Sequence, residues 1–425
     1  MYLVYADEQG NVYDHPELYG LARSGDLIVE ILEEELIPLP EGATLVGLPN
    51  TRAVGMNPET GEMMPMPNGS QAVGALLPQG FTRLCLPGYV KTDKTYRLPL
   101  FGYSAVVWKD GGFYVGAELT DDPEKWNPLN CDTKGVKAGV NELVTKYPEN
   151  RLYEHLSNCA LEYECLTSSN TFLGRWEGAV PVSHSCNAGC FGCISDQPDD
   201  SGFVSPQTRM DFRPRVDELV QVMLEHLKTP ESIVSFGQGC EGEPSTQAKI
   251  IIEAMREVRS VTNMGYININ TNAGLNDHIR GIVDAGLDLM RVSTISALDA
   301  HYNAYYKPRG YTLANVEKSL KYAVSQGVYT SINYLVFPGV TDREEEIEAM
   351  VEFVKRTGLR LIQMRNLNID PESYLGLIPP AQGEILGMKT MLDIFREELP
   401  EVVIGSYTHI PPAGMARIKP GNVHI

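Results

Sequence analysis

The chain has 425 residues, enough for two or three domains, and 43% of them are apolar, which is enough for a large buried core. Its formal net charge is −20, and such an acidic surface repels phosphate backbones, so we expect no nucleic-acid partner. No stretch approaches the run of about 18 apolar residues that spans a bilayer, and the first residues lack the basic start of a secretion signal. We therefore expect a cytoplasmic protein without a membrane partner.

Residues 1–120 contain short β-like runs separated by Gly, Pro and Asn, and they predict a β-rich accessory domain. "YLVYADEQGNVYDH" predicts a hairpin around Gln9-Gly10-Asn11, and "VVWKDGGFYV" predicts another with its turn at Asp110-Gly111-Gly112. Residues 57–70 read as a mobile loop. Its three methionines would form either an adaptable binding surface or an exposed loop of no consequence.

Residues 121–172 predict a helical linker region, and from residue 173 to 375 short strands alternate with amphipathic helices. Six strand–helix units predict a parallel sheet with right-handed crossovers, whose strands we expect to be apolar runs buried on both faces. Ser245 is the expected N-cap of one helix. Residues 376–425 predict a C-terminal helix and a tail that folds over the sheet or frays. The six strands are expected at 178–184, 232–236, 266–270, 288–294, 330–337 and 360–366.

Six units are two short of a closed eight-stranded barrel, so the fold class that we predict is α/β, an open partial (β/α)6 barrel with a β-rich N-terminal accessory domain. In such a scaffold the chemistry lies at the carboxyl ends of the strands.

The stretch "HSCNAGCFGCIS" places Cys186, Cys190 and Cys193 in a C-x₃-C-x₂-C pattern directly after the first predicted strand. Glycines between them allow a tight loop in which three sulfurs converge. Three thiolates can hold three irons of a [4Fe–4S] cluster and leave the fourth iron open, and an open position is typical of a catalytic metal site. The main alternative is a Cys₃His zinc site that includes His184, which otherwise caps or orients the loop.

This cysteine spacing, followed by strand–helix repeats, resembles the radical S-adenosylmethionine (SAM) superfamily over residues 175–370. The resemblance implies a [4Fe–4S] cluster, SAM bound at its open iron, reductive cleavage of SAM and abstraction of a hydrogen atom from a small-molecule or peptide substrate. It also implies an electron donor such as flavodoxin or ferredoxin. "FPGVTD" is similar to activases that place a radical on a partner protein, which leaves an activase-like function as one alternative. A non-catalytic zinc or Fe–S scaffold protein is the other.

Four further stretches are similar to looser motifs of that superfamily: "GCEGEP", "NTNAG", "RVSTIS" and "SINYLVFPGVTD". Gly192 stands where the family usually has an aromatic residue, and the neighbouring aromatic is Phe191. Arg365, at the end of the sixth strand, would meet an anionic substrate group or the SAM carboxylate, or would pair with nearby acids. The cofactor-binding residues that we expect are Gly192, Glu241, Gly242, Glu243, Thr271, Asn272, Ser293, Asn333 and Arg365.

Two other groups of residues allow a functional and a structural interpretation. Cys240, beside the "EGEP" stretch, could donate a hydrogen atom to a product radical or simply pack against the sheet. "HYNAYYKPRGY" could bind an anionic substrate through its two cations, or form a helix with a buried tyrosine face. The remaining cysteines match no ligand spacing and are interpreted as buried, inert thiols rather than ligands of a second cluster: Cys85, Cys131, Cys159 and Cys165.

Overall fold

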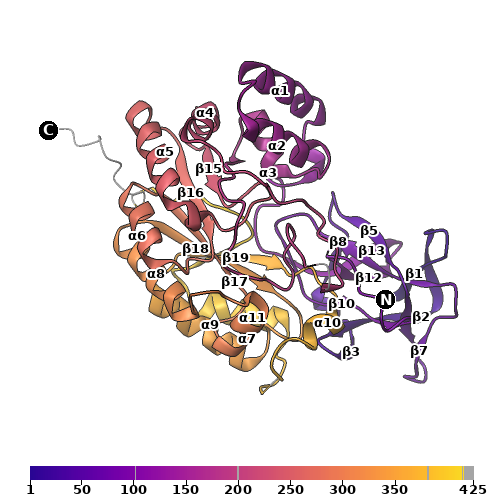
Figure 1. The fold of residues 1–425 in the computed structure, drawn as a ribbon. Helices are drawn as coiled ribbons and strands as arrows, with labels where there is room; N and C mark the ends of the chain where they lie inside the picture. Colours follow the sequence, from indigo (N-terminus) through magenta and orange to yellow (C-terminus); the bar gives the residue numbers. More distant parts are fainter. Residues whose placement is uncertain (101, 199–200, 381, 414, 416–425) are drawn as a thin grey trace.

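The structure is a computed structural model, and it describes residues 1–100, 102–198, 201–380, 382–413 and 415. A β-rich N-terminal region lies beside an α/β region, and three helices between them in sequence form a separate layer (Figure 1). None of the helices in these described ranges combines the length and apolar character that crossing a membrane requires.

The β-rich region is one antiparallel sheet of thirteen strands, so the prediction of a β-rich N-terminal region is confirmed. The hairpin around Gly10 joins the first two strands, and the turn at Asp110-Gly111 joins two others. The strands are β1 (Tyr2–Ala6), β2 (Val12–Ser24), β3 (Leu27–Glu30), β4 (Leu36–Pro38), β5 (Thr44–Leu48), β6 (Thr51–Met56), β7 (Met63–Pro65), β8 (Gln71–Leu76), β9 (Phe81–Arg83), β10 (Leu86–Pro87), β11 (Tyr89–Lys91), β12 (Ser104–Lys109) and β13 (Gly112–Leu119).

The methionine-containing segment is not the loop that we expected. Met63 and Met64 lie in β7, which pairs with β6. Met66 is buried in a core cluster of the β-rich region, and only Met63 is largely exposed. A methionine side chain fills irregular space in a core, which explains the position of Met66 without a binding role.

The predicted helical linker consists of α1 (Thr133–Lys146), α2 (Arg151–Leu161) and α3 (Leu166–Leu173). Asp132 and Asn150 cap the first two helices by accepting hydrogen bonds from backbone N–H groups of the first turn. Arg151 and the buried carboxylate of Glu218 form an ion pair at 2.7 Å, which connects α2 to the α/β region.

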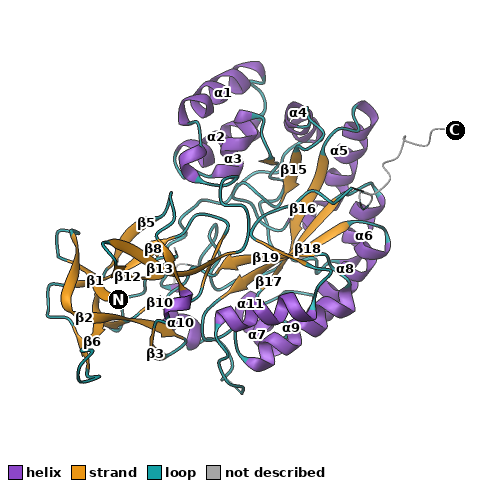
Figure 2. Cartoon of the chain, turned by 180° about the vertical axis from the view of Figure 1, so that it is seen from behind, coloured by secondary structure: helices purple, strands orange, loops and turns teal. Residues whose placement is uncertain are grey.

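The α/β region is built on a seven-stranded, all-parallel sheet whose strands follow one another in sequence order. Helices lie along the outer side of this sheet (Figure 2). The strands are β14 (Glu177–Ala179), β15 (Ile233–Phe236), β16 (Tyr266–Thr271), β17 (Leu289–Thr294), β18 (Tyr329–Val336), β19 (Leu361–Asn366) and β20 (Val403–Gly405). The helices are α4 (Val216–His226), α5 (Ala248–Val261), α6 (Asn276–Asp284), α7 (Asp299–Tyr306), α8 (Leu313–Ser325), α9 (Glu344–Thr357), α10 (Pro371–Leu375) and α11 (Met388–Glu398).

The alternating strands and helices agree with the sequence prediction in order and type. Three details differ. The first strand is shorter than expected and begins at Glu177, and β20 is a seventh strand that the sequence did not predict. Ser245 is not an N-cap, because it lies inside a 3₁₀ turn whose cap is the carboxylate of Glu243.

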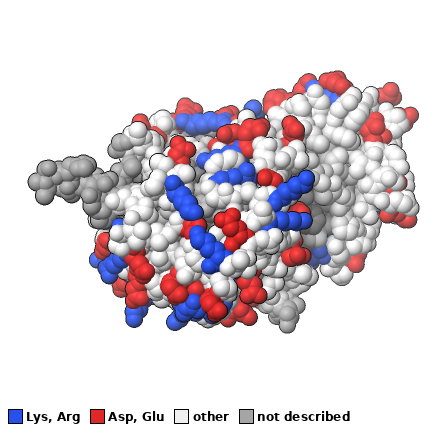
Figure 3. Space-filling view, turned by 90° about the horizontal axis from the view of Figure 1, so that it is seen from above, with Lys and Arg blue, Asp and Glu red and all other residues white. Residues whose placement is uncertain are grey.

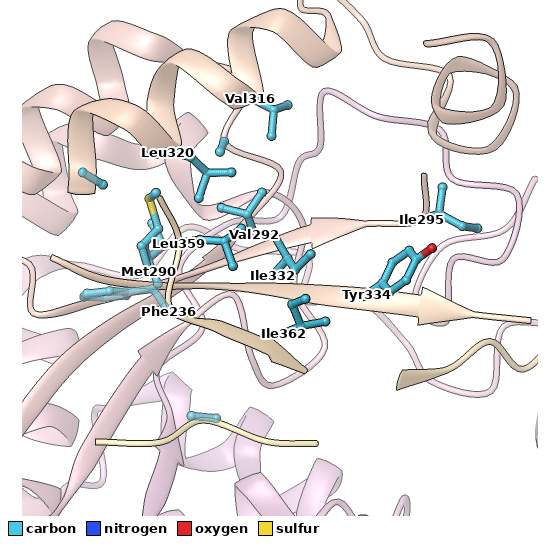
Figure 4. Packing of buried hydrophobic residues seen from close by; sticks show 14 of the residues in the cluster. Phe236, Met290, Val292, Ile295, Val316, Leu320, Ile332, Tyr334, Leu359 and Ile362 are labelled. Carbon is cyan, nitrogen blue, oxygen red and sulfur yellow. The ribbon is translucent and has the colours of Figure 1, made fainter. Parts of the chain in front are cut away.

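The two faces of the parallel sheet have different chemistry, which contradicts the expectation of strands that are apolar on both faces. The outer face is apolar and packs against the helices, as Val292 and Ile332 do against Leu320 (Figure 4). Each such buried aliphatic side chain contributes about 1.5–3 kcal/mol to stability. The inner face carries polar side chains from the middle of the strands to their carboxyl ends. These residues are Ser235, Asn268, Asn270, Arg291, Ser293, Ser331, Asn333, Gln363 and Arg365.

The amino ends of the same strands form an apolar layer, where Ile233, Leu289 and Leu361 pack with Ile410 from the chain after β20. Thr408 reaches the polar layer above and accepts a hydrogen bond from Arg291 at 2.9 Å. The described part of the predicted tail therefore packs under the sheet, at the end opposite to the carboxyl ends of the strands. The rest of that prediction, residues 414 and 416–425, lies outside the described residues.

The β-rich region packs against the segments that follow β18 and β19. Lys91 Nζ lies 2.6 Å from Asp370 Oδ2 and 3.1 Å from Glu372 Oε2, and the lysine and aspartate are buried. The backbone N–H of Arg83 donates a hydrogen bond to the side chain of Asn366, and its guanidinium donates one to the backbone carbonyl of Leu367. These contacts place the β-rich region beside the carboxyl end of the parallel sheet.

Candidate functional site

The cysteine loop follows β14 and rests on the carboxyl end of α7. The backbone N–H of Gly189 donates to the carbonyl of Tyr306 at 2.9 Å, and the N–H of Phe191 donates to the carbonyl of Tyr305 at 2.9 Å. Gly192 has no room for a side chain, because a Cβ there would lie 2.9 Å from the Tyr305 hydroxyl. The sequence around α7 therefore forms a support for the loop.

This support decides between the two interpretations of "HYNAYYKPRGY". Its four tyrosines are buried, which agrees with a helix that turns a tyrosine face to the core. Lys307 lies over the ring of Phe191, 5.7 Å from its centroid, and the backbone N–H of Arg309 donates to the carbonyl of Asn187. The segment holds the cysteine loop, and neither cation lines the cavity that the cysteines face.

A cavity of about 480 Å³ lies at the carboxyl ends of the parallel strands, and the sulfur-bearing loop forms one wall of it. Nearly all of the residues that the sequence nominated line this cavity: Cys186, Cys190, Gly192, Cys193, Cys240, Glu241, Gly242, Glu243, Thr271, Asn272, Ser293 and Arg365. Asn333 does not line it, but it pairs with Ser293 in the sheet register and lies on the same inner face.

Glu241 fixes the loop after β15 to the strand before the cysteines. Its carboxylate accepts backbone hydrogen bonds from Val182 at 2.8 Å, Ser183 at 2.7 Å and Gly237 at 2.6 Å. Burial raises the pKa of Glu241 to about 8, against the opposing effect of these three donors. Gly242 continues the contact, since a Cβ there would lie 2.1 Å from the Ser185 carbonyl oxygen.

Glu243 fixes the same loop to the end of β16. It accepts hydrogen bonds from the backbone N–H groups of Ser245 and Asn272 and from the hydroxyl of Thr271. Asn272 in turn donates to the side-chain oxygen of Asn187, two residues before Gly189, at 2.6 Å. The ends of β14, β15 and β16 and the cysteine loop are thus connected by hydrogen bonds.

Arg365 reaches the cavity from β19 with little of its charge compensated. Its guanidinium donates to the carbonyl of Ser406 at 3.1 Å, and it has no carboxylate within ion-pair distance among the residues that the structure describes. Burial and the nearby guanidinium of Arg291 lower the pKa of Arg365 to about 10. The described residues therefore give no support to the interpretation of Arg365 as one half of a structural ion pair.

Arg209 is a cavity residue that the sequence analysis missed. One of its guanidinium nitrogens lies 3.5 Å from the sulfur of Cys193, and another lies 2.6 Å from Asp196. No local pattern identifies this arginine, because it lies sixteen residues after Cys193 in an irregular segment.

Figure 3 shows that basic and acidic side chains are interspersed on the face seen from above.

One expectation about the cysteine loop fails, and the aromatic residue of the loop is not part of the cavity lining. His184 is exposed and its side chain makes no hydrogen bond within the described part of the chain, so it does not orient the loop. Phe191 does not face the cavity, because its ring packs edge-on against Phe203 at a centroid distance of 5.3 Å.

A family model described as the radical SAM superfamily matches residues 180–354, so the chain contains a radical SAM domain. No curated protein matches the sequence. Solved structures with a similar fold include SuiB of Streptococcus suis bound to the precursor peptide SuiA, at 14% identity and a TM-score of 0.39, with 61% of this chain and 53% of that chain covered. A radical SAM methyltransferase from Sphaerobacter thermophilus has 15% identity and a TM-score of 0.39, with 57% and 69% covered.

The FeFe-hydrogenase maturase HydG from Carboxydothermus hydrogenoformans has 14% identity and a TM-score of 0.38, with 65% of this chain and 71% of that chain covered. The chain spans only 53% to 63% of the length of three of the matched structures. Scores this low support no argument about this chain, so its classification depends on the family model.

The cofactors of a radical SAM domain are a [4Fe–4S] cluster and SAM, and the residues around the cavity fit them. Burial raises the pKa of Cys186 to about 11 and that of Cys190 well above its usual value, and bound iron supplies the positive charge that ionises such thiols. Asn270 Nδ2, which belongs to a residue that lines the cavity, is a buried polar atom without a hydrogen-bond partner among the described residues. A polar ligand in the cavity would satisfy such atoms.

The three cysteines do not form a site for a single ion. In the ranges that the structure describes, no three His, Cys, Asp or Glu side chains are close enough together to hold one metal ion. A cubane cluster binds each thiolate at a different iron, so its ligands need not converge on one point. The arrangement gives no support to the Cys₃His zinc alternative.

Proposed function

We propose that this protein is a radical SAM enzyme that cleaves SAM reductively at a [4Fe–4S] cluster and abstracts a hydrogen atom from a small-molecule or peptide substrate. The observation that carries the proposal is the single cavity that the three cysteines share with polar residues from the ends of β15, β16, β17 and β19. When bound there, the cluster supplies the electron that breaks the sulfonium bond.

The residues of the chain have separate roles in this proposal. Cys186, Cys190 and Cys193 would hold the cluster, and the backbone of Gly192 would contact the nucleoside of SAM. The carboxylates of Glu241 and Glu243, which accept hydrogen bonds from neighbouring segments, would fix the loop that faces the amino group of SAM. Thr271, Asn272, Ser293 and Asn333 supply polar contacts.

Arg365 is the residue that we assign to an anionic group, either the SAM carboxylate or a substrate carboxylate. Its half-buried guanidinium lacks a carboxylate partner among the described residues, and an anionic group in the cavity would compensate its charge.

The surrounding organisation belongs to the same proposal. We infer a partial (β/α)6 barrel over residues 173–375, an accessory domain over 1–120, a helical linker over 121–172 and a C-terminal helix and tail over 376–425. An external donor such as flavodoxin or ferredoxin would reduce the cluster. A cytoplasmic location would suit its eight cysteines, all of which are free.

Anaerobic reconstitution tests the proposal directly. The purified chain should bind about four irons and four sulfides, and it should release 5′-deoxyadenosine when a reductant and SAM are added. The variant Cys193→Ala should lose most of its iron and release at least about tenfold less 5′-deoxyadenosine.

The matched control is Cys85→Ala, which removes a buried thiol of the β-rich region and should keep both properties. A reconstituted protein that binds zinc in place of iron, or that binds the cluster without cleaving SAM, would contradict the proposal. The first outcome would favour the zinc scaffold and the second the Fe–S scaffold.

A further inference from the structure

Two cysteines outside the proposed cluster site lie against each other at the wall of the cavity. The sulfurs of Cys159 and Cys240 are 3.2 Å apart, although the two residues are separated by 81 positions in the sequence. Cys159 lies on α2, where it is fully buried, and Cys240 lies in the loop after β15 and lines the cavity. Cys159 is buried, as the sequence predicted, but it is in contact with a second thiol.

The polar groups around this pair favour a reactive rather than an inert thiol. His155, one turn before Cys159 on α2, has its Nε2 2.7 Å from the carbonyl oxygen of Gly239 and 3.9 Å from the sulfur of Cys159. A carbonyl oxygen only accepts, so this nitrogen carries a proton that it donates to Gly239, and it lies close to the sulfur of Cys159. The Oε1 atom of Gln207 lies 3.2 Å from the sulfur of Cys240, on the cavity side.

The backbone presents Cys240 to the pair in a conformation that residues other than glycine rarely adopt. Its φ is +59°, and Gly237 and Gly239 just before it also have positive φ. The hydrogen bond between the two thiols lowers the pKa of Cys159, as His155 also does, and it raises the pKa of Cys240. The thiol of Cys159 donates to the sulfur of Cys240, whose own thiol donates to Gln207 Oε1.

We propose that Cys159 and Cys240 are a redox-active dithiol that forms a reversible disulfide at the cavity wall. The oxidant that the site would take is a small disulfide of the glutathione class. Cys240 first gives its proton to water, and its thiolate then attacks one sulfur of the oxidant and releases a thiolate. Cys159 then loses its proton to that thiolate and attacks the Cys240 sulfur, which forms the protein disulfide and releases a second thiolate. In total, the dithiol loses two electrons and two protons, and one small disulfide becomes two thiols once the second thiolate takes up the proton that Cys240 gave to water.

The order in which the two sulfurs react follows from their positions relative to the cavity. Cys240 lines the cavity and is the sulfur that a small molecule can reach, whereas Cys159 lies behind it and can only resolve the mixed disulfide. Cys165 also lines the cavity, but its sulfur is not among the hydrogen-bond contacts of either partner. The proposal does not depend on the proposed SAM chemistry, and either can fail without the other.

The test equilibrates the anaerobic full-length protein, with its cluster reconstituted, in mixtures of reduced and oxidised glutathione, then alkylates free thiols and maps disulfides by mass spectrometry. We expect one linked peptide pair, Cys159 with Cys240, that appears as a single two-electron transition. The thiols of Cys85 and Cys131 should remain free to react with the alkylating agent after denaturation. Absence of the Cys159–Cys240 link in fully oxidised glutathione would overturn the proposal.

Two variants test the assigned order of the sulfurs. In Cys159→Ser, Cys240 should accumulate a mixed disulfide with glutathione, because the resolving thiol is absent. In Cys240→Ser, Cys159 should stay unmodified for at least about tenfold longer, because nothing presents it to the cavity. Circular dichroism checks that both variants fold, and Cys159→Ala and Cys240→Ala replace any variant that does not. If Cys159 is modified as fast as Cys240, or if Cys165 forms the link in its place, the proposal is wrong.

Discussion

At the scale of single residues, Arg209 has its guanidinium in contact with Cys193, one of the three cluster ligands that we propose. Its guanidinium lies 3.5 Å from the Cys193 sulfur, and a hydrogen-bond donor or positive charge at a ligand sulfur stabilises the reduced form of a cluster. We expect Arg209→Gln to shift the reduction potential of the reconstituted cluster to a more negative value. A redox titration followed by electron paramagnetic resonance measures the shift.

The control for this change is Arg256→Gln, which removes an exposed arginine on α5 and should leave the potential as it is. Iron content should match the unchanged protein in both variants. An unaltered potential in Arg209→Gln would mean that the arginine only pairs with Asp196.

Glu241 gives a second prediction at this scale, because its pKa of about 8 lies above the 4.5 of a free glutamate. A carboxyl group whose pKa is raised by folding stabilises the protein fully at pH values below its pKa in the unfolded state. This contribution is lost as the pH rises through its pKa in the folded state. We therefore expect the free energy of unfolding, relative to that of Glu241→Gln, to fall between about pH 4.5 and about pH 8. Chemical denaturation across this window measures it.

The variant Glu253→Gln, at an exposed position on α5, should have the same free energy of unfolding as the unchanged protein at every pH. If the stability difference between the protein and Glu241→Gln instead rises with pH, then Glu241 is ionised in the fold, and its three backbone donors outweigh its burial.

At the scale of elements, the loop after β15 meets the cysteine loop across Gly242. A methyl group there would lie 2.1 Å from the Ser185 carbonyl oxygen, so Gly242→Ala must push the two loops apart. Overpacking of this kind costs about 1–3 kcal/mol, and the displaced loop should also hold less iron. Chemical denaturation and iron analysis of the reconstituted protein check both expectations.

Gly112→Ala is the matched control, because a methyl group there meets no atom within 4 Å. It should change neither stability nor iron content by a measurable amount. A Gly242→Ala protein with full stability and full iron content would show that the two loops can separate without harm.

At the scale of the whole molecule, the β-rich region is held to the α/β region by the buried pair of Lys91 and Asp370. Removing one partner of a buried ion pair leaves an uncompensated charge and costs about 3 kcal/mol or more. We expect Lys91→Met to lower the free energy of unfolding by that amount, measured by chemical denaturation. Lys109→Met, which breaks a pair with the exposed Glu33, should cause a much smaller loss.

The sequence predicted those parts of the molecule whose signals are local. Cys186, Cys190 and Cys193 lie within eight residues, and the order of strands and helices repeats along the chain, so both could be read directly. The alternation in "YININ" was also present, but it was interpreted as a continuous apolar run because parallel strands are usually buried on both faces. Its asparagines instead line the inner face, where Asn268 bonds to the hydroxyl of Ser235.

The parts that the sequence did not predict depend on contacts between distant segments. The pairing of Cys159 with Cys240 needs the position of α2 relative to β15, which no spacing reveals. β20 has only three residues and pairs with a single neighbour, so its local signal is weak. The cavity contact of Arg209 depends on the path of an irregular segment.

The backbone hydrogen bonds that Glu241 and Glu243 accept connect the ends of three neighbouring strands to one another. A local opening that released the amide of Val182 would therefore also have to release those of Gly237 and Asn272. In deuterated water, these amides should lose their protons together and at a common rate, although they belong to segments that are far apart in the chain. The rim of the sheet would then behave as a single cooperative unit whose opening free energy is shared by all its members.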